Sequence, residues 1–154
     1  MRKILCYTAL VLMMGCGFGK KKPNISAVDV PLTTIRYEQL FFSIDTLRLD
    51  AALQKLSTKE PFFTQDFLYN ILATTPETAA KEVPLFINAY KTLYQESSTK
   101  FSSIGPYETA IKEGLQHVKY YFPNYKLPTK LITFIGPINS FGNIITIDAL
   151  AIGL

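Results

Sequence analysis

Apolar residues recur at helical spacing over most of the chain, and this pattern predicts a series of helices. Asp45 is a favourable N-cap residue for a helix over residues 46–56, where three leucines fall on one face. The dipeptide Glu60-Pro61 should end that helix, because proline cannot donate the backbone hydrogen bond that a helix interior needs. The Phe-rich pattern that follows predicts a second helix, which ends near Thr74.

Two further helices are predicted in the middle of the chain. Thr75 and Pro76 are typical of an N-cap and the first helical position, and Pro84 should interrupt or kink the helix that they begin. Residues 97–103 are polar, and we expect them to form a loop. Residues 106–122 carry apolar side chains three or four positions apart, which predicts that they form the longest helix, with one apolar face.

Short β-branched runs lie on either side of this helical region. Residues 35–44 predict a strand that leads into a helical turn, and residues 131–135 and 144–148 flank a turn rich in Gly, Pro and Asn. The predicted fold class is therefore α+β, with a mainly helical N-terminal layer followed by a C-terminal β-hairpin. A hairpin alone is marginally stable, and the apolar ending at residues 149–154 is unusual for a terminus. We therefore expect the chain to be the front part of a longer protein.

The first residues have the three parts of a bacterial lipoprotein signal. Arg2 and Lys3 give a positively charged start, and residues 4–14 form an apolar stretch. That stretch is shorter than the roughly 20 apolar residues that span a bilayer. Gly15-Cys16 follows, and in lipoprotein signals such a cysteine is acylated and becomes the first residue. We predict that Cys16 is lipidated and binds membrane lipid through its acyl chains (palmitate or similar). The alternative is an ordinary secretory signal in which Cys16 is incidental.

The chain is predicted to have three parts: a signal peptide (residues 1–15), a lipidated N-terminus with a flexible tether (residues 16–31), and a single α+β domain (residues 32–154) that is truncated at its C-terminus. Cleavage would remove Cys6 and leave Cys16 as the one remaining cysteine, so the domain would fold without an internal disulfide.

The net charge of +4 comes from the N-terminus and not from the predicted domain. From Pro23 onward, 11 Lys and Arg residues stand against 12 Asp and Glu residues. Nucleic-acid binding requires basic residues grouped on the fold itself, so we predict no nucleic-acid partner. The lysines at positions 20–22 would contact anionic headgroups or would simply be solvated.

Residues typical of catalysis are scarce. His117 is the only histidine and cannot by itself form a zinc site of the HExxH type, so we expect it to be a solvated helix residue. Asp148 stands at the end of a predicted strand, where a capping or turn-bonding role is expected. Glycine-rich phosphate loops and the GxSxG nucleophile motif are missing from the sequence. We therefore predict no catalytic residue, no metal site and no cofactor, and no enzyme activity for this chain.

Several stretches, taken in order, carry a resemblance to a known family. They are the lipoprotein signal, residues 35–42 (IRYEQLFF), residues 60–63 (EPFF), residues 118–125 (VKYYFPNY) with Pro128, and the runs at 131–135 and 144–150. In this order they resemble the gliding-motility lipoprotein GldB family. The resemblance implies a cell-envelope lipoprotein that faces the periplasm and is associated with the gliding and secretion machinery. Family members are about twice as long, so the chain resembles their N-terminal half, and their distant likeness to zinc metallopeptidases implies a larger zincin-like domain.

Three hypotheses for function follow. The first is non-catalytic support of a membrane-linked gliding or secretion complex. In this hypothesis, the exposed members of a set of six aromatic residues would form an interface, although most of the set is expected in the core. The set is Phe41, Phe42, Phe62, Phe63, Tyr120 and Tyr121. The alternative is the N-terminal part of a metallopeptidase-like hydrolase whose zinc site lies beyond residue 154. The third is a ligand-binding lipoprotein that serves a transporter, although no residue specifies a ligand.

Overall fold

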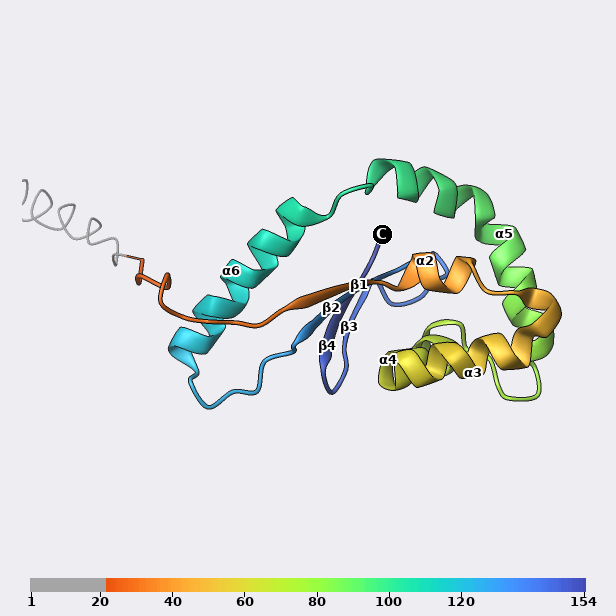
Figure 1. Ribbon diagram of the computed structural model, residues 1–154, viewed down its shortest axis with the longest axis horizontal. Coiled ribbons are helices and arrows are strands. Elements are labelled where there is room, and N and C mark those ends of the chain that lie inside the picture. The colour runs from red at the N-terminus through yellow and green to blue at the C-terminus, as the bar shows by residue number, and fades with distance from the viewer. Residues whose placement is uncertain (1–21) are drawn as a thin grey trace, which may run out of the picture.

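The computed structural model describes residues 22–154 and shows a small sheet with helices around it (Figure 1). The helical elements are α2 (Tyr37–Phe42), the short turn η2 (Thr46–Arg48), α3 (Leu49–Lys59), α4 (Pro61–Asp66), the wide turn η3 (Phe67–Ile71), α5 (Ala79–Lys100) and α6 (Gly105–Tyr121). The strands are β1 (Thr33–Arg36), β2 (Lys130–Phe134), β3 (Asn143–Ile145) and β4 (Ala149–Gly153). The predicted α+β class is confirmed, and Cys16 lies outside the described residues.

The four strands form one mixed sheet in the order β1-β2-β4-β3. β1 is parallel to β2 and β2 is parallel to β4, so that Ile132 lies between Ile35 and Ala151. β3 is antiparallel to β4. The predicted hairpin between residues 131–135 and 144–148 is therefore wrong, because the C-terminal hairpin of this chain is β3–β4. β2 and β4 are apolar on both faces and take the centre of the sheet, as buried parallel strands do.

One face of the sheet packs on the helices through a cluster of aromatic rings. The ring centroids of Phe134 and Phe63 are 5.5 Å apart, those of Tyr37 and Phe63 are 4.7 Å apart, and those of Phe41 and Phe67 are 4.7 Å apart. All five side chains are at most 1% exposed. Tilted and edge-to-face contacts of this kind are favourable for aromatic rings. This core holds α2, α4 and η3 against the sheet.

The predicted break between two helices at Glu60-Pro61 is confirmed. The Asp45 side chain accepts a hydrogen bond of 3.0 Å from the Leu47 backbone N–H and caps η2, the turn that precedes α3. α3 ends at Lys59, and Pro61 starts α4, where the hydrogen bond that proline lacks is not needed. The chain then turns at Ala73, which adopts a left-handed φ of 54°.

The start of α5 differs from the prediction. The helix begins at Ala79 and not at Pro76. Thr75 and Thr78 bond to each other in the preceding turn, where each backbone N–H donates to the other side-chain hydroxyl over 2.9 and 3.3 Å. This reciprocal cap occupies the residues that the sequence assigned to the first helical turn.

The course of α5 also differs from the prediction. Pro84, which was expected to interrupt or kink the helix, does not interrupt it, and Figure 1 shows that α5 bends along its course. The helix ends at Lys100, so the polar loop expected at residues 97–103 is wrong for most of its length. Ser97 is only 7% exposed in this helix, and its burial outweighs the low helix propensity of a Ser- and Thr-rich segment. α5 has 22 residues and α6 has 17, so α6 is not the longest helix as expected.

The chain before β1 runs along α6 (Figure 1). The Gln116 side-chain amide on α6 donates a hydrogen bond of 2.7 Å to the backbone oxygen of Val28. Val30 is 1% exposed. Residues 22–30, expected to belong to the flexible tether, therefore make specific contacts with α6.

Candidate functional site

A buried ionic network lies where β1 leads into α2. The Arg36 Nε atom pairs with one carboxylate oxygen of Glu38 at 2.5 Å, and the Thr133 hydroxyl donates to the other at 2.7 Å. Glu38 is 1% exposed and Thr133 is fully buried. Arg36 and Thr133 are register partners on neighbouring strands, so the sheet itself brings this network together. Burial of a carboxylate is costly unless it is paired and hydrogen-bonded, and here its partners fasten α2 to β2.

Two polar atoms of the same region have no hydrogen-bond partner among residues 22–154. They are the Arg36 Nη2 atom and the Thr34 hydroxyl oxygen, and both are buried. Thr34 precedes Arg36 by two positions on β1, so both side chains project from the same face of the sheet. Burial of an unpaired hydroxyl is unfavourable by roughly 1–3 kcal/mol, which makes Thr34 a point of local instability.

A second ionic cluster joins the helical layer to the sheet. The Lys130 Nζ atom lies 2.8 Å from Glu60 Oε2 and 3.0 Å from Asp148 Oδ2. The hydrogen bond to Glu60 is the main cause of the raised pKa of Lys130, to which Asp148 also contributes against the effect of burial. The other Asp148 oxygen accepts from the Thr146 hydroxyl at 3.2 Å. The expected turn-bonding role of Asp148 is thus confirmed, and a salt bridge is added to it.

Tyr37 connects the aromatic core with this second cluster. Its hydroxyl donates a hydrogen bond of 3.3 Å to Thr64 Oγ1, and the side chain is fully buried. Burial raises the pKa of Tyr37 well above its ordinary value, the hydrogen bond to Thr64 opposes this, and the negative charge of Glu60 adds to it. Tyr37 therefore stays neutral under ordinary conditions and contributes a polar contact to the core.

An apolar groove lies on the face of the sheet opposite the aromatic core. Its volume is about 420 Å³, and it is lined by Leu115, Val118, Phe122, Tyr125, Leu127, Pro128, Ile145 and Leu150. Leu150 lies between the core residues Ala149 and Ala151 on β4 and so points away from them. The C-terminal half of α6 therefore forms one wall, and the β3–β4 hairpin forms the other. Such a groove accepts apolar groups rather than charged ones.

A second hollow, of about 550 Å³, lies between the end of α2 and α3. Its lining mixes apolar side chains with Arg48, Lys55 and Lys59 and with the carboxylate of Asp45. Arg48 and Asp45 pair at 3.8 Å, but both are largely exposed, so the pair is weak. This lining favours no single class of ligand.

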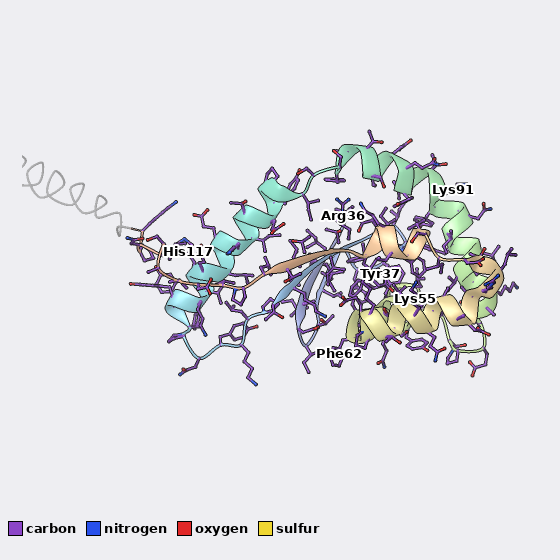
Figure 2. All side chains as sticks on the ribbon, viewed as in Figure 1. Arg36, Tyr37, Lys55, Phe62, Lys91 and His117 are labelled. Carbon is purple, nitrogen blue, oxygen red and sulfur yellow. The ribbon has the colours of Figure 1, made fainter. Side chains whose placement is uncertain are left out.

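The aromatic set that the sequence suggested as an interface is divided by the structure. Phe41 and Phe63 belong to the core, and Phe42 is half-buried and stacks on Tyr94 at 4.6 Å. The other three side chains are at least half exposed: Phe62, Tyr120 and Tyr121. His117 is half-buried on α6, at the end of the molecule where the chain before β1 begins (Figure 2).

The described part of the chain offers no group of three or more His, Cys, Asp and Glu side chains that could hold a metal ion. The metallopeptidase alternative therefore gains no support from these residues. None of the helices within residues 22–154 is both long and apolar enough to cross a membrane.

Sequence reasoning did not identify the apolar groove. Its two walls are more than 20 positions apart in the chain, and pairing of β3 with β4 is needed to bring them together. One signal was available, because the apolar face of the helix predicted at residues 106–122 includes Leu115, Val118 and Phe122, which line the groove.

The chain was also compared with known proteins. A family model described as gliding motility protein GldB matches residues 19–154. No curated protein and no solved structure shows significant similarity to the chain.

Proposed function

Because the chain belongs to the gliding motility protein GldB family, we propose that it is a lipid-anchored, non-catalytic component of a gliding or secretion complex in the cell envelope. The observation that carries the proposal is the family match itself, which begins at residue 19 and ends at residue 154. The match starts three positions after Cys16, so the candidate lipid attachment directly precedes the family domain.

The proposed anchor is the acylated Cys16, which faces the periplasm together with the domain. It is supported by the basic start at Arg2 and Lys3, by the apolar stretch at residues 4–14 and by Gly15 before the cysteine. Two or three acyl chains hold a protein stably on a membrane, whereas one chain is marginal.

The proposed role in the complex is structural. Two buried glutamates support this role, because each joins a helical segment to the sheet. Glu38 fastens α2 to β2, and Glu60 fastens the α3–α4 junction to β2. These contacts hold the helical layer against the sheet, which suits a protein that holds partners in place. The exposed apolar groove offers a surface for such a partner.

The anchor is tested by the intact mass of the protein extracted from a membrane fraction. The expected mass exceeds that of the polypeptide from Cys16 onward by the mass of glycerol and two or three acyl chains. The variant Cys16→Ser should lose this mass and leave the membrane fraction. Cys6→Ser is the matched control, because Cys6 lies within the predicted signal peptide and should leave the mature product unchanged. Unmodified protein from the unaltered gene would overturn the anchor.

The role is tested by deletion of the gene. Colony spreading and secretion of surface proteins should both fall, and the unaltered gene should restore them. Complementation by Cys16→Ser should restore less than complementation by Cys6→Ser. Unchanged spreading and secretion after deletion would overturn the proposed role, whatever the state of the anchor.

A further inference from the structure

The C-terminal end of α6 exposes an unusual number of aromatic side chains. Tyr120, Tyr121, Phe122 and Tyr125 are 50, 60, 64 and 53% exposed, respectively. The rings of Tyr120 and Tyr121 meet edge to face at 5.1 Å. Single exposed apolar residues are common, but four large rings within six positions form a patch, and such patches mark interaction surfaces. We call these four residues the α6 aromatic tip.

The surroundings of the α6 aromatic tip are basic. Lys119 and Lys126 flank it, and no Asp or Glu occurs between Glu113 and Asp148 in the sequence. The Lys119 Nζ atom donates a hydrogen bond of 2.7 Å to the backbone oxygen of Pro123, which holds the loop after α6 in place. Lys126 is exposed to solvent. The patch therefore combines amphipathic rings with positive charge.

The chain enters the domain at the same end of the molecule. Pro23, Asn24, Ile25 and Ser26 line a hollow with Glu108, Glu113 and other residues of the first two thirds of α6, and Gln116 bonds to Val28. Figure 1 shows that the chain before β1 begins on the same side as the C-terminal half of α6, at one end of the long axis. The start of the described chain thus packs beside α6, toward the end of the long axis at which that helix ends.

Chain length limits how far this end can be from a membrane that holds Cys16. Cys16 and Lys22 are six positions apart, and an extended chain spans at most about 3.6 Å per residue, or roughly 22 Å in total. A lipid-anchored Cys16 therefore keeps Lys22 within about 22 Å of the lipid to which it is attached. The end of the domain that carries α6 is then the end nearest the bilayer.

We propose that the α6 aromatic tip lies in the headgroup region of the anionic bilayer to which Cys16 is attached, and that it orients the domain on the membrane. The inference rests on the lipid anchor under Proposed function. Tyrosine rings are enriched at membrane interfaces, where one end of the side chain is in apolar surroundings and the other is hydrated. Lys126 adds attraction to anionic headgroups, and the apolar lining shared by Phe122 and Tyr125 continues the patch into the groove.

The test uses tryptophan as a depth probe, because the chain contains no Trp. The full-length lipoprotein carrying Phe122→Trp is isolated from membranes and reconstituted in vesicles of phosphatidylcholine and phosphatidylglycerol with brominated acyl chains. Its emission should be quenched by about twofold or more relative to unbrominated vesicles and should shift to shorter wavelength. Phe62→Trp is the matched control. It is also half exposed but lies on α4, which packs on the opposite face of the sheet from the groove, and its emission should not change.

Charge is tested with a second substitution. Lys126→Glu, added to Phe122→Trp, should reduce the quenching in vesicles that contain phosphatidylglycerol and should leave it unchanged in phosphatidylcholine alone. Lys91→Glu is the control, because Lys91 is an exposed lysine on α5, far from α6 (Figure 2).

The outcomes separate the inference from the proposal beneath it. Protein that fails to float with the vesicles overturns both the anchor and the orientation. Protein that floats with unquenched Phe122→Trp emission overturns the orientation alone. Equal quenching of the two probes also overturns it, because no particular end of the domain would then face the lipid. A concentration-dependent blue shift of the Phe122→Trp probe without vesicles would instead assign the patch to contact between protein molecules.

Discussion

Lys130 and Glu60, 70 positions apart in the chain, form an ion pair in which Nζ lies 2.8 Å from Oε2. Lys130 is the first residue of β2, and Glu60 lies between α3 and α4. The Glu60 side chain is 8% exposed, whereas that of Lys130 is 28% exposed. The pair therefore satisfies a nearly buried carboxylate and also joins the helical layer to the start of the central strand β2.

Replacement of Lys130 by methionine should destabilise the domain by about 1–3 kcal/mol, because Glu60 would lose its charged partner while it remains buried. The free energy of unfolding is measured by urea titration of the full chain in mild detergent. Lys126→Met is the matched control, because Lys126 is exposed and its replacement should change stability by less than about 0.5 kcal/mol. Equal unfolding midpoints for the two variants would show that the pair contributes no stability.

Thr133 and Thr34 should respond in opposite directions to the same substitution. Thr133→Val removes the donor to the buried carboxylate of Glu38 and should cost about 1–3 kcal/mol. Thr34→Val removes a buried hydroxyl that has no partner among the described residues, so it should be neutral or should stabilise by up to about 1 kcal/mol. Both changes keep the side-chain shape and the β-branch. A larger loss at Thr34 than at Thr133 in thermal unfolding would contradict the assigned network.

The stability of the domain should fall as the pH rises above about 10. Burial raises the pKa of Tyr37 above its ordinary value of 10.0, so the unfolded tyrosine releases its proton at a pH where the native one retains it. The pKa of Lys130 is also raised, from 10.5, so its contribution is complete below about pH 10.5 and is lost as the pH rises through the native pKa. Both groups act in the same direction.

Tyr37→Phe should therefore flatten the alkaline decline in the free energy of unfolding. At neutral pH it should cost less than about 1 kcal/mol, since the hydrogen bond to Thr64 is long at 3.3 Å. Tyr121→Phe is the control, because this ring is 60% exposed and its loss should leave the pH profile unchanged. Parallel alkaline declines in the unaltered protein and in Tyr37→Phe would show that Tyr37 is not the titrating group.

Two glycines should differ in their response to alanine. At Gly136, an added Cβ would lie 2.8 Å from the Ile71 Cγ2 methyl and 3.3 Å from Phe134 Cε2, in the core. Gly136→Ala should therefore destabilise by about 1–3 kcal/mol through overpacking. Gly114 lies within α6 with no atom within 4 Å of the added Cβ, and Gly114→Ala should stabilise by roughly 0.5–1 kcal/mol. Shifts of the same sign in thermal unfolding would contradict the packing at Gly136.

Local signals in the sequence predicted several parts of the fold. Asp45 caps the turn before α3, and Pro61 starts α4. Ile35 lies in β1, and residues 131–134 of the predicted run at 131–135 lie in β2. Each of these depends on neighbours within a few positions, such as a side chain that bonds a nearby backbone N–H or a proline that cannot donate. The order of residues along the chain therefore determines them, and the family resemblance rests on the same order.

The tertiary structure alone decided which strands pair and which charges meet. Residues 131–135 and 144–148 looked like one hairpin, but β2 instead pairs in parallel with β1 and β4, because strands that are apolar on both faces are most stable at the centre. The same pairing brings Thr133 to Glu38 across 95 positions and builds the groove beside α6. The spacing of apolar residues in the sequence indicates which side chains are buried. Contacts this distant in sequence depend on the register of the whole sheet, and no local pattern specifies that register.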